Sequence, residues 1–392
     1  MPKNAEFDVV VYGASGFTGR LVAEYLQATY GGSDLKWAMA GRNAAKLAEV
    51  RTEMGVSDGV PLIEADSADP ASMDAMAERA KVVITTVGPY LKYGEPLVAA
   101  CAKAGTDYVD LSGEPPFMAS MIEKYNEAAK ASGARIVHSC GFDSVPFDMG
   151  VWFLQEAAKA KFGNPVARVR GRVRMMKGTF SGGTAASGAE TTKLAMSDPK
   201  VMAGLLNPFS LAEGFEGPKQ PTGAKPIEDE ALGSWAAPFV MAVINTKNIH
   251  RSNYLMGHPY GEDFVYDEMI LTGPGEKGKA IAEGLAKAPP MGSEKDAPKP
   301  GEGPSKAERE AGMYDLLFHG TSADGQVIMA GVKGDRDPGY GSTSKMLAEC
   351  ALCLLDEAKG AKGGVLTPAP VFGGAIIDRL EAKAGLTFKI EG

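Results

Sequence analysis

Residues 8–19 constrain the fold of this chain more than any other stretch. A short apolar run, Val9–Val11, ends at Gly13, and Gly16 and Gly19 follow at intervals of three. Apolar residues at helical spacing begin directly after the last of these glycines. A strand, a glycine turn and a helix in this order are typical of a site that binds a dinucleotide.

Each glycine has a separate role in such a turn. The first permits a tight turn, the second lets the backbone approach a diphosphate, and the third lets the helix lie close to the sheet. The helix N-terminus then offers free N–H groups to the phosphates. The alternative is a tight strand–helix connection without a ligand. The pattern predicts a diphosphate site made by Gly13, Ser15, Gly16, Phe17, Thr18 and Gly19.

Strand and helix patterns alternate over the first part of the chain. Several of the expected strands are continuous apolar runs, which suits a parallel sheet that is covered by helices on both faces. The fold class predicted is therefore α/β, with a Rossmann-type doubly wound parallel sheet. The strands expected are 8–12, 36–40, 61–65, 81–87, 108–111 and 135–139.

The pattern changes after residue 145. A long helix is expected over 145–162, a turn over 180–187 with a helix at 189–196, and a loop over 215–235. The strands expected are 166–176, 239–245, 264–272, 313–321 and 326–333. These elements predict an inserted α+β domain with a mixed or antiparallel sheet.

Three parts of the chain follow from this pattern: a nucleotide-binding domain over 1–145, a substrate or dimerisation domain over 146–335, and a C-terminal part over 336–392. The last part carries helical patterns at 341–358 and 373–384 and a strand pattern at 386–390, and is expected to pack on the first domain. Residues 287–306 are rich in proline, glycine and charge, so they form either an irregular insertion or a lid.

Composition excludes several classes of protein. The net charge of −8 argues against broad nucleic-acid binding. No apolar run reaches the roughly 18–20 residues that span a bilayer. The first residues lack the plan of a signal peptide, which predicts a cytoplasmic location. The four cysteines are expected to be free thiols, and neither they nor the histidines show the spacing of metal ligands.

The end of the second expected strand indicates which nicotinamide cofactor is bound. NAD-binding folds usually carry an acidic residue there, which binds the ribose 2′-hydroxyl. This chain has Arg42 and Asn43 instead, and no Asp or Glu lies between Asp34 and Glu49. A guanidinium can make a forked contact with a 2′-phosphate. The sequence therefore predicts NADP, although a surface cation at a helix start is the alternative for Arg42.

The next two strand ends complete the expected cofactor site. Asp66 and Ser67 end the third strand, where adenine contacts commonly fall. Val87, Gly88, Pro89 and Tyr90 end the fourth and are expected at the cofactor, where the smooth backbone of Gly88 and Pro89 could lie against the ribose–nicotinamide half. A plain turn is the alternative for Gly88 and Pro89.

Motifs along most of the chain identify it as similar to a known family. Residues 85–90 read Thr-Thr-Val-Gly-Pro-Tyr, residues 108–114 Tyr-Val-Asp-Leu-Ser-Gly-Glu, and residues 140–146 Cys-Gly-Phe-Asp-Ser-Val-Pro. With the glycine turn and the later stretches 182–184, 339–346 and 364–368, they resemble the saccharopine dehydrogenase-like NADP-binding oxidoreductases. The similar branch contains bacterial trans-acting enoyl reductases of lipid synthesis and eukaryotic saccharopine dehydrogenase-like proteins. The resemblance implies an interrupted Rossmann domain and NADP.

Polar residues at the strand ends are the candidates for catalysis. Reduction of a polarised double bond needs a hydride, a hydrogen-bond donor for the developing negative charge, and a proton source. Tyr90, Tyr93 and Asp143 are the predicted catalytic residues, and Cys140 is expected near the cofactor. Amphipathic packing is the alternative for the tyrosines, and helix capping is the alternative for the aspartate.

Three functions follow as hypotheses. The first is an NADPH-dependent reductase of an enoyl or carbonyl group on an apolar, lipid-like substrate, because the second domain is rich in methionine, which lines adaptable pockets. The second is a saccharopine-type enzyme that acts at a C–N bond. The third is an NADP-binding sensor or scaffold without turnover. A homodimer and a peripheral membrane contact are further expectations, with no nucleic-acid partner.

Overall fold

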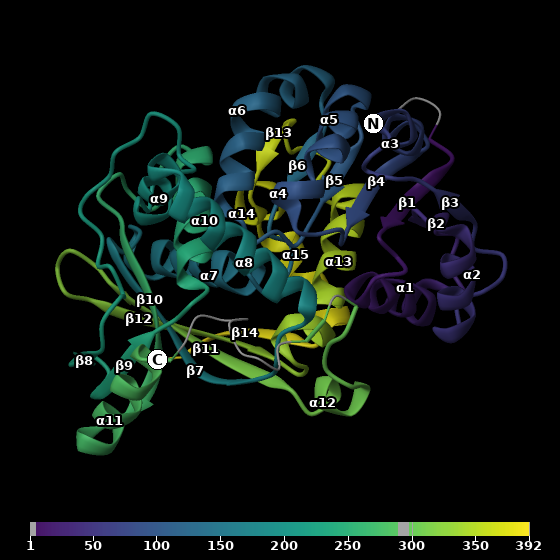
Figure 1. Cartoon of the computed structure of the whole chain (residues 1–392). Helices are drawn as coiled ribbons and strands as arrows, with labels where there is room; N and C mark the ends of the chain where they lie inside the picture. Colours follow the sequence, from purple (N-terminus) through teal and green to yellow (C-terminus); the bar gives the residue numbers. More distant parts are fainter. Residues whose placement is uncertain (1–4, 289–297, 300, 392) are drawn as a thin grey trace.

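Two seven-stranded sheets form the framework of the protein in the computed structural model, which describes residues 5–288, 298–299 and 301–391 (Figure 1). Residues 289–297 and 300 of the expected loop 287–306 lie outside the described residues. No helix among the described residues is both long and apolar enough to cross a membrane. The four cysteines are free and buried, as expected.

Sheet A is wholly parallel and has the strand order β13-β6-β5-β4-β1-β2-β3. The predicted Rossmann-type sheet is therefore confirmed. Its strands are β1 (Phe7–Tyr12), β2 (Trp37–Gly41), β3 (Leu62–Glu64), β4 (Ala80–Thr85), β5 (Asp107–Val109), β6 (Arg135–Val137) and β13 (Gly364–Leu366).

Helices cover both faces of sheet A because successive side chains of each strand point to opposite faces. Val9 and Val11 belong to one apolar core with α1 and α2, and Val10 and Tyr12 belong to the other with α3, α5 and α6. The helices are α1 (Phe17–Tyr30), α2 (Ala44–Glu53), α3 (Pro70–Glu78), α4 (Tyr90–Tyr93), α5 (Glu95–Ala104) and α6 (Pro115–Ser132).

Sheet B is mixed and has the order β14-β12-β11-β7-β10-β9-β8, with β10 and β7 parallel and the other pairs antiparallel. It runs across the lower half of Figure 1. Its strands are β7 (Arg168–Lys177), β8 (Ile227–Asp229), β9 (Ser234–Pro238), β10 (Val265–Gly273), β11 (Met313–Thr321), β12 (Val327–Gly334) and β14 (Leu386–Ile390).

Two long helices pack against sheet B and against each other. Helix α7 (Val145–Phe162) follows β6 and packs on β11, β12 and β14, and α10 (Ala242–Leu255) packs on α7 and β10. The other helices of this half are α8 (Gly182–Ser197), α9 (Pro199–Leu206), α11 (Gly275–Ala286) and α12 (Lys306–Glu310).

The sequence-based assignment of residues 215–245 was wrong. The expected loop 215–235 contains β8 and the start of β9, and the expected strand 239–245 contains the beginning of α10. The apolar run Phe239–Ile244 has the composition of a strand, but tertiary packing against β10 and α7 selects a helix.

The C-terminal segment contributes to both halves. Helix α13 (Thr343–Asp356) packs on α1, β4 and β5, and Arg135 pairs with Asp107 while donating to the carbonyl oxygens of Leu354 and Ala358. Strand β13 joins sheet A, but β14 pairs with β12 in sheet B, so the expected return of the whole tail to the first domain is wrong for its last strand. The other elements are η1 (Pro338–Ser342), α14 (Pro368–Phe372), α15 (Gly374–Arg379) and η2 (Leu380–Ala384).

The contact of α7 with sheet B gives a prediction for stability. A Cβ at Gly150 would lie 2.2 Å from Cε2 of the buried Phe318 ring, so Gly150→Ala should lower the free energy of unfolding by about 1–3 kcal/mol through overpacking. Gly204 in α9 is the matched control, because nothing lies within 4 Å of its Cβ position. Gly204→Ala should raise the free energy of unfolding by up to ~1 kcal/mol. Urea unfolding measures both, and equal effects would contradict the packing argument.

Candidate functional site

The glycine turn after β1 has the geometry that a diphosphate requires. Gly13 has φ of 85°, in the left-handed region that favours glycine, and its carbonyl oxygen accepts a hydrogen bond from the N–H of Gly16 at 2.8 Å. A Cβ at Gly19 would lie 2.1 Å from that same oxygen, so no other residue fits there. No side chain caps α1 at Gly16, so the N–H groups of its first turn can bind an anion.

Two further loops, those after β3 and β4, meet the glycine turn at the carboxyl edge of sheet A. The Tyr12 hydroxyl accepts a hydrogen bond from the N–H of Ser67 at 3.0 Å, which links the loops after β1 and β3. The Thr86 hydroxyl donates to the carbonyl of Gly13 at 3.3 Å, and a Cβ on Gly13 would meet the Val87 side chain at 2.7 Å. The structure therefore brings together the predicted residues of the loops after β1, β3 and β4.

Arg42 and Asn43 lie in the loop between β2 and α2. Both are exposed, and Arg42 forms no ion pair with a carboxylate in the described part of the chain. The side-chain oxygen of Asn43 accepts from the N–H of Lys46 at 2.9 Å and caps α2, so its amide N–H₂ group remains for a ligand. Ser15 lies beside this loop, with its Oγ 3.7 Å from the Cβ position of Gly41.

Helix α8 borders the loop after β4. Ser187 Oγ lies 3.6 Å from the Cβ position of Gly88, and Glu190 pairs with Lys92 of α4 at 2.6 Å. The expected turn over 180–187 is wrong, because α8 begins at Gly182, where the Ser181 side chain accepts from the N–H of Thr184. The Gly182–Thr184 segment is thus the first turn of a helix.

The two candidate tyrosines have different surroundings. Tyr90 is buried, its hydroxyl donates to the carbonyl of Thr85 at 3.1 Å, and burial raises its pKa. The carboxylate of buried Glu114 accepts from the N–H groups of Tyr90 and Leu91 and holds the start of α4. Tyr93, at the end of α4, is 43% exposed. No hydrogen bond joins Tyr90, Tyr93 and Asp143 in the described residues.

Cys140 lies in the apolar core beneath the edge of the sheet. Its side chain is buried, and burial, followed by the neighbouring Cys350, raises the pKa of its thiol. Its backbone N–H donates to the carbonyl of Asp110 at 2.7 Å. The thiol and the backbone N–H of Cys140 are thus both turned toward the protein.

Asp143 follows β6 at the same edge of sheet A and faces the second sheet. Its carboxyl is half-buried, and desolvation raises its pKa to about 7 although Asn245 Nδ2 lies 3.5 Å from its Oδ1. The same Nδ2 donates to Oε1 of Glu268 at 2.8 Å. Burial, and then the nearby charge of Asp143, raise the pKa of Glu268 to about 8. A carboxyl group with a pKa near 7 can serve as a general acid at neutral pH.

Sequence analysis missed Asn245 and Glu268 because both lie in segments that it assigned to strands. A signal was nevertheless present. Asn245, Asn248 and Ser252 are spaced by three and four residues, so they share one face of a helix, and all three are buried. A polar helix face that is buried marks a site where side chains bind other polar groups.

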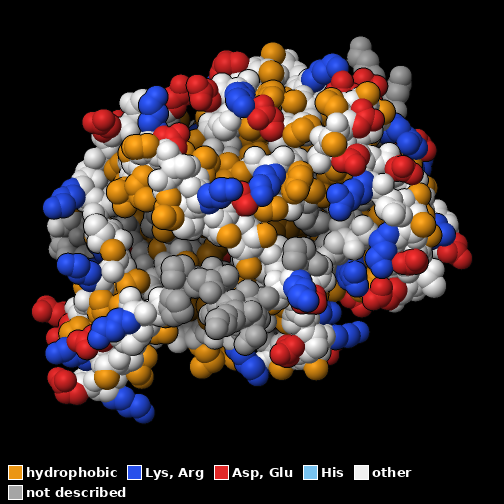
Figure 2. Space-filling view, in the orientation of Figure 1, with side chains coloured by type: hydrophobic (Ala, Val, Ile, Leu, Met, Phe, Trp, Pro, Cys, Tyr) orange, Lys and Arg blue, Asp and Glu red, His pale blue; other side chains and the backbone are white. Residues whose placement is uncertain are grey.

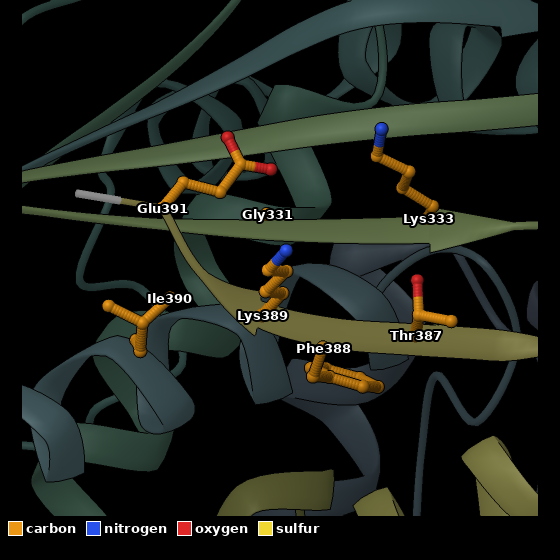
Figure 3. Close-up of a pocket in the computed structure, with 7 residues that line it drawn as sticks. All are labelled: Gly331, Lys333, Thr387, Phe388, Lys389, Ile390 and Glu391. Carbon is orange, nitrogen blue, oxygen red and sulfur yellow. The ribbon is translucent and has the colours of Figure 1, made fainter.

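The concave surface in Figure 3 is not part of this site. It lies on β12 and β14 at the edge of sheet B and carries both lysine and glutamate side chains. Its lining residues are Gly331, Lys333, Thr387, Phe388, Lys389, Ile390 and Glu391. None of them belongs to a loop at the carboxyl edge of sheet A.

A parallel doubly wound sheet with a glycine turn, four converging loops and a desolvated carboxyl group defines a dinucleotide-binding oxidoreductase. Comparison with known proteins agrees. The saccharopine dehydrogenase NADP-binding domain family matches residues 9–137. A putative trans-acting enoyl reductase of Mycobacterium tuberculosis is 42% identical over 98% of this chain and 97% of its own length, and the trans-acting enoyl reductase of Mycobacterium bovis BCG is 37% identical over 97% and 96%.

The chain therefore belongs to the saccharopine dehydrogenase-like NADP-binding oxidoreductases, in the branch of the trans-acting enoyl reductases. Apo saccharopine dehydrogenase of Saccharomyces cerevisiae has the same fold, with a TM-score of 0.51 and 14% identity over 98% of this chain and 100% of that one. The expected family and fold class are confirmed.

The close approach at Gly19 gives a prediction for nucleotide binding. Gly19→Ala places a methyl group against the Gly13 carbonyl, which forces the turn open and should weaken dinucleotide binding at least tenfold, about 1.4 kcal/mol. Gly32→Ala is the control, because nothing lies within 4 Å of its Cβ position. Titration calorimetry with NADPH and NADH measures the dissociation constants. Unchanged binding by a folded Gly19→Ala variant would contradict the assignment of this turn.

Proposed function

We propose that the protein is an NADPH-dependent reductase of a C=C (enoyl) or carbonyl group on an apolar, lipid-like substrate. The observation that supports this proposal most directly is the half-buried Asp143 carboxyl. Burial raises its pKa to about 7, and it lies at the same edge of sheet A as the glycine turn. The names of the trans-acting enoyl reductase relatives support an enoyl group.

The residues at this edge fit a dinucleotide. The close packing of α1 on the glycine turn at Gly19 and the uncapped start of α1 suit a diphosphate, and the exposed Arg42 suits a 2′-phosphate. When bound, the nicotinamide supplies the hydride. We assign binding to Gly13, Ser15, Gly16, Phe17, Thr18, Gly19, Arg42, Asn43, Asp66, Ser67, Val87, Gly88 and Pro89, and NADP is preferred to NAD because of Arg42.

Asp143 acts as the proton donor in this proposal. Its O–H bond breaks as a C–H or O–H bond forms on the reduced substrate, and the resulting carboxylate receives N–H from Asn245. Tyr90 holds the start of α4 and the loop beside the substrate, since its hydroxyl already donates to Thr85. Tyr93 stays a candidate donor at the surface end of α4.

Several observations favour an apolar substrate over an amino acid. The Cε atom of Met241 lies 3.6 Å from the Cβ position of Gly113, which places a flexible apolar side chain near the carboxyl end of β5. Two lysines of the adjoining helices are engaged, Lys92 of α4 with Glu190 and Lys247 of α10 with the carbonyl of Leu205. A substrate carboxylate would therefore lack these cations. Apolar side chains also gather over α9 and α10 in Figure 2.

The role of Arg42 gives a test of cofactor choice. Arg42→Ala removes the charge that pairs with the 2′-phosphate. The KM for NADPH should therefore rise about tenfold or more, because a charge-assisted contact contributes about 1–3 kcal/mol to binding. The KM for NADH should change little. Absorbance at 340 nm with each cofactor measures this. Arg51→Ala, in the last turn of α2, is the control. Equal affinity of the wild type for NADPH and NADH would contradict the preference.

The role of Asp143 predicts a pH dependence. Its acid form is the active one, so kcat should be constant below pH 7 and fall as the pH rises through about 7. Asp143→Asn cannot donate, so kcat should fall about 100-fold and that pH dependence should vanish. An enoyl thioester, a long-chain ketone and an amino acid with a 2-oxoacid form the substrate panel. Turnover of the last pair alone would instead favour action at a C–N bond.

A further inference from the structure

The amide of Asn245 lies between two carboxyl groups that come from different parts of the chain. Its Nδ2 donates to Glu268 Oε1 at 2.8 Å and lies 3.5 Å from Asp143 Oδ1. Asp143 follows the last strand of the nucleotide-binding half, Asn245 lies on α10, and Glu268 lies in the middle of β10. Asn245 and Glu268 are almost completely buried.

No cation neutralises this pair among the described residues. Neither carboxylate forms an ion pair, and Arg172, the arginine whose charge favours ionised Glu268, is engaged with Asp229 and Asp267. Glu268 instead accepts from Asn245 and from the Tyr266 hydroxyl, the latter at 2.8 Å. Two such groups resist simultaneous ionisation, so the pair retains protons near neutral pH.

The oxygen of the Asn245 amide is buried and has no hydrogen-bond partner among the described residues. An amide has a donor end and an acceptor end, and half a turn about its last side-chain bond exchanges them. With N–H groups toward the carboxyls, Asn245 stabilises their ionised forms. With its oxygen toward them, it accepts from their protonated forms.

We propose that Asn245 is the positioning residue of the proton donor, and that its amide couples Asp143 to Glu268 by turning its N–H or its C=O toward them as Asp143 loses or regains its proton. This inference rests on the proposed role of Asp143. Each turnover breaks the O–H bond of Asp143 and forms one bond to hydrogen on the reduced substrate, and the next proton comes from water. Asn245 itself gains and loses no proton.

The other titratable groups near the pair are already engaged or point elsewhere. On α10, Lys247 donates to the Leu205 carbonyl and the His250 ring packs against Phe209 and Phe264. On α7, the Asp148 carboxyl accepts from Ser252 and from the N–H of Ala369. On β11, the Tyr314 hydroxyl pairs with Ser342. Asn245 is thus the neighbour that bonds to both carboxyls.

Asn245→Leu tests the proposal, because leucine has the same number and branching of side-chain heavy atoms as asparagine and removes both ends of the amide. Without an N–H donor the Asp143 carboxylate is less stable, so the fall of kcat at high pH should move upward by about half a pH unit or more, and kcat should drop about tenfold with the KM for NADPH unchanged. Asn248→Leu is the matched control. Asn248 lies one turn later on the same buried helix face and donates to the Ser144 hydroxyl at 2.7 Å, with no carboxyl in contact.

A second readout separates this inference from the proposed function. NMR titration of ¹³C-labelled aspartate, assigned with Asp143→Asn, follows the Asp143 carboxyl without any turnover. Its pKa should rise in Asn245→Leu and should not rise in Asn248→Leu or in Glu268→Gln, which removes a like charge. An unchanged pKa in folded Asn245→Leu, or in Asn245→Ala if leucine prevents folding, overturns the inference. A shifted pKa without any reductase activity overturns only the proposed function.

Discussion

The close approach of helix α1 to the turn after β1 is the contact on which the rest of the site depends. A Cβ at Gly19 would stand 2.1 Å from the Gly13 carbonyl oxygen, so the helix can lie where it does only with glycine there. This approach aims the uncapped start of α1 along the carboxyl edge of sheet A. All the strands of that sheet are parallel, so the loops that follow them lie at the same edge. The loops after β2, β3 and β4 therefore place Arg42, Ser67 and Val87 at this edge.

The parts of the fold that were predictable are those specified by neighbouring residues. The run Val9–Val11 with its glycines, and the hairpin of β11 and β12, have local patterns, and both lie where they were expected. The segments that were wrong depend on distant contacts. Residues 239–245 have the composition of a strand, but packing against β10 and α7 favours a helix. Strand β14 pairs with β12, which is separated from it by more than fifty residues of intervening chain. Tertiary packing determines the secondary structure of such segments, and a short window of sequence holds no information on those distant contacts.

The candidate site divides in the same way. The proposed phosphate-binding half is one short motif, and its turn geometry could be predicted from the spacing of its glycines. The proposed proton-donating half joins Asp143, Asn245 and Glu268 from a loop, a helix and a strand, so only the fold shows that they meet. Asp143 was predicted from its place at a strand end, but its surroundings were not. The spacing of Asn245 and Asn248 contained a usable signal, which the strand assignment concealed.

In the proposed reductase, cofactor binding and proton donation place opposite physical requirements on the two halves of the molecule. Sheet A needs an open, polar edge, because a dinucleotide carries several charges and binds through exposed backbone N–H groups. A proton donor near neutral pH needs the opposite, a desolvated carboxyl, and a loop at an open edge would leave Asp143 ionised. Asp143 is desolvated beside Asn245 of α10 and Glu268 of β10. In the proposed reaction, the N–H of Asn245 stabilises the carboxylate after the proton has left. In the proposed reductase, residues of the second half thus set the protonation state of a residue that follows a strand of the nucleotide-binding half.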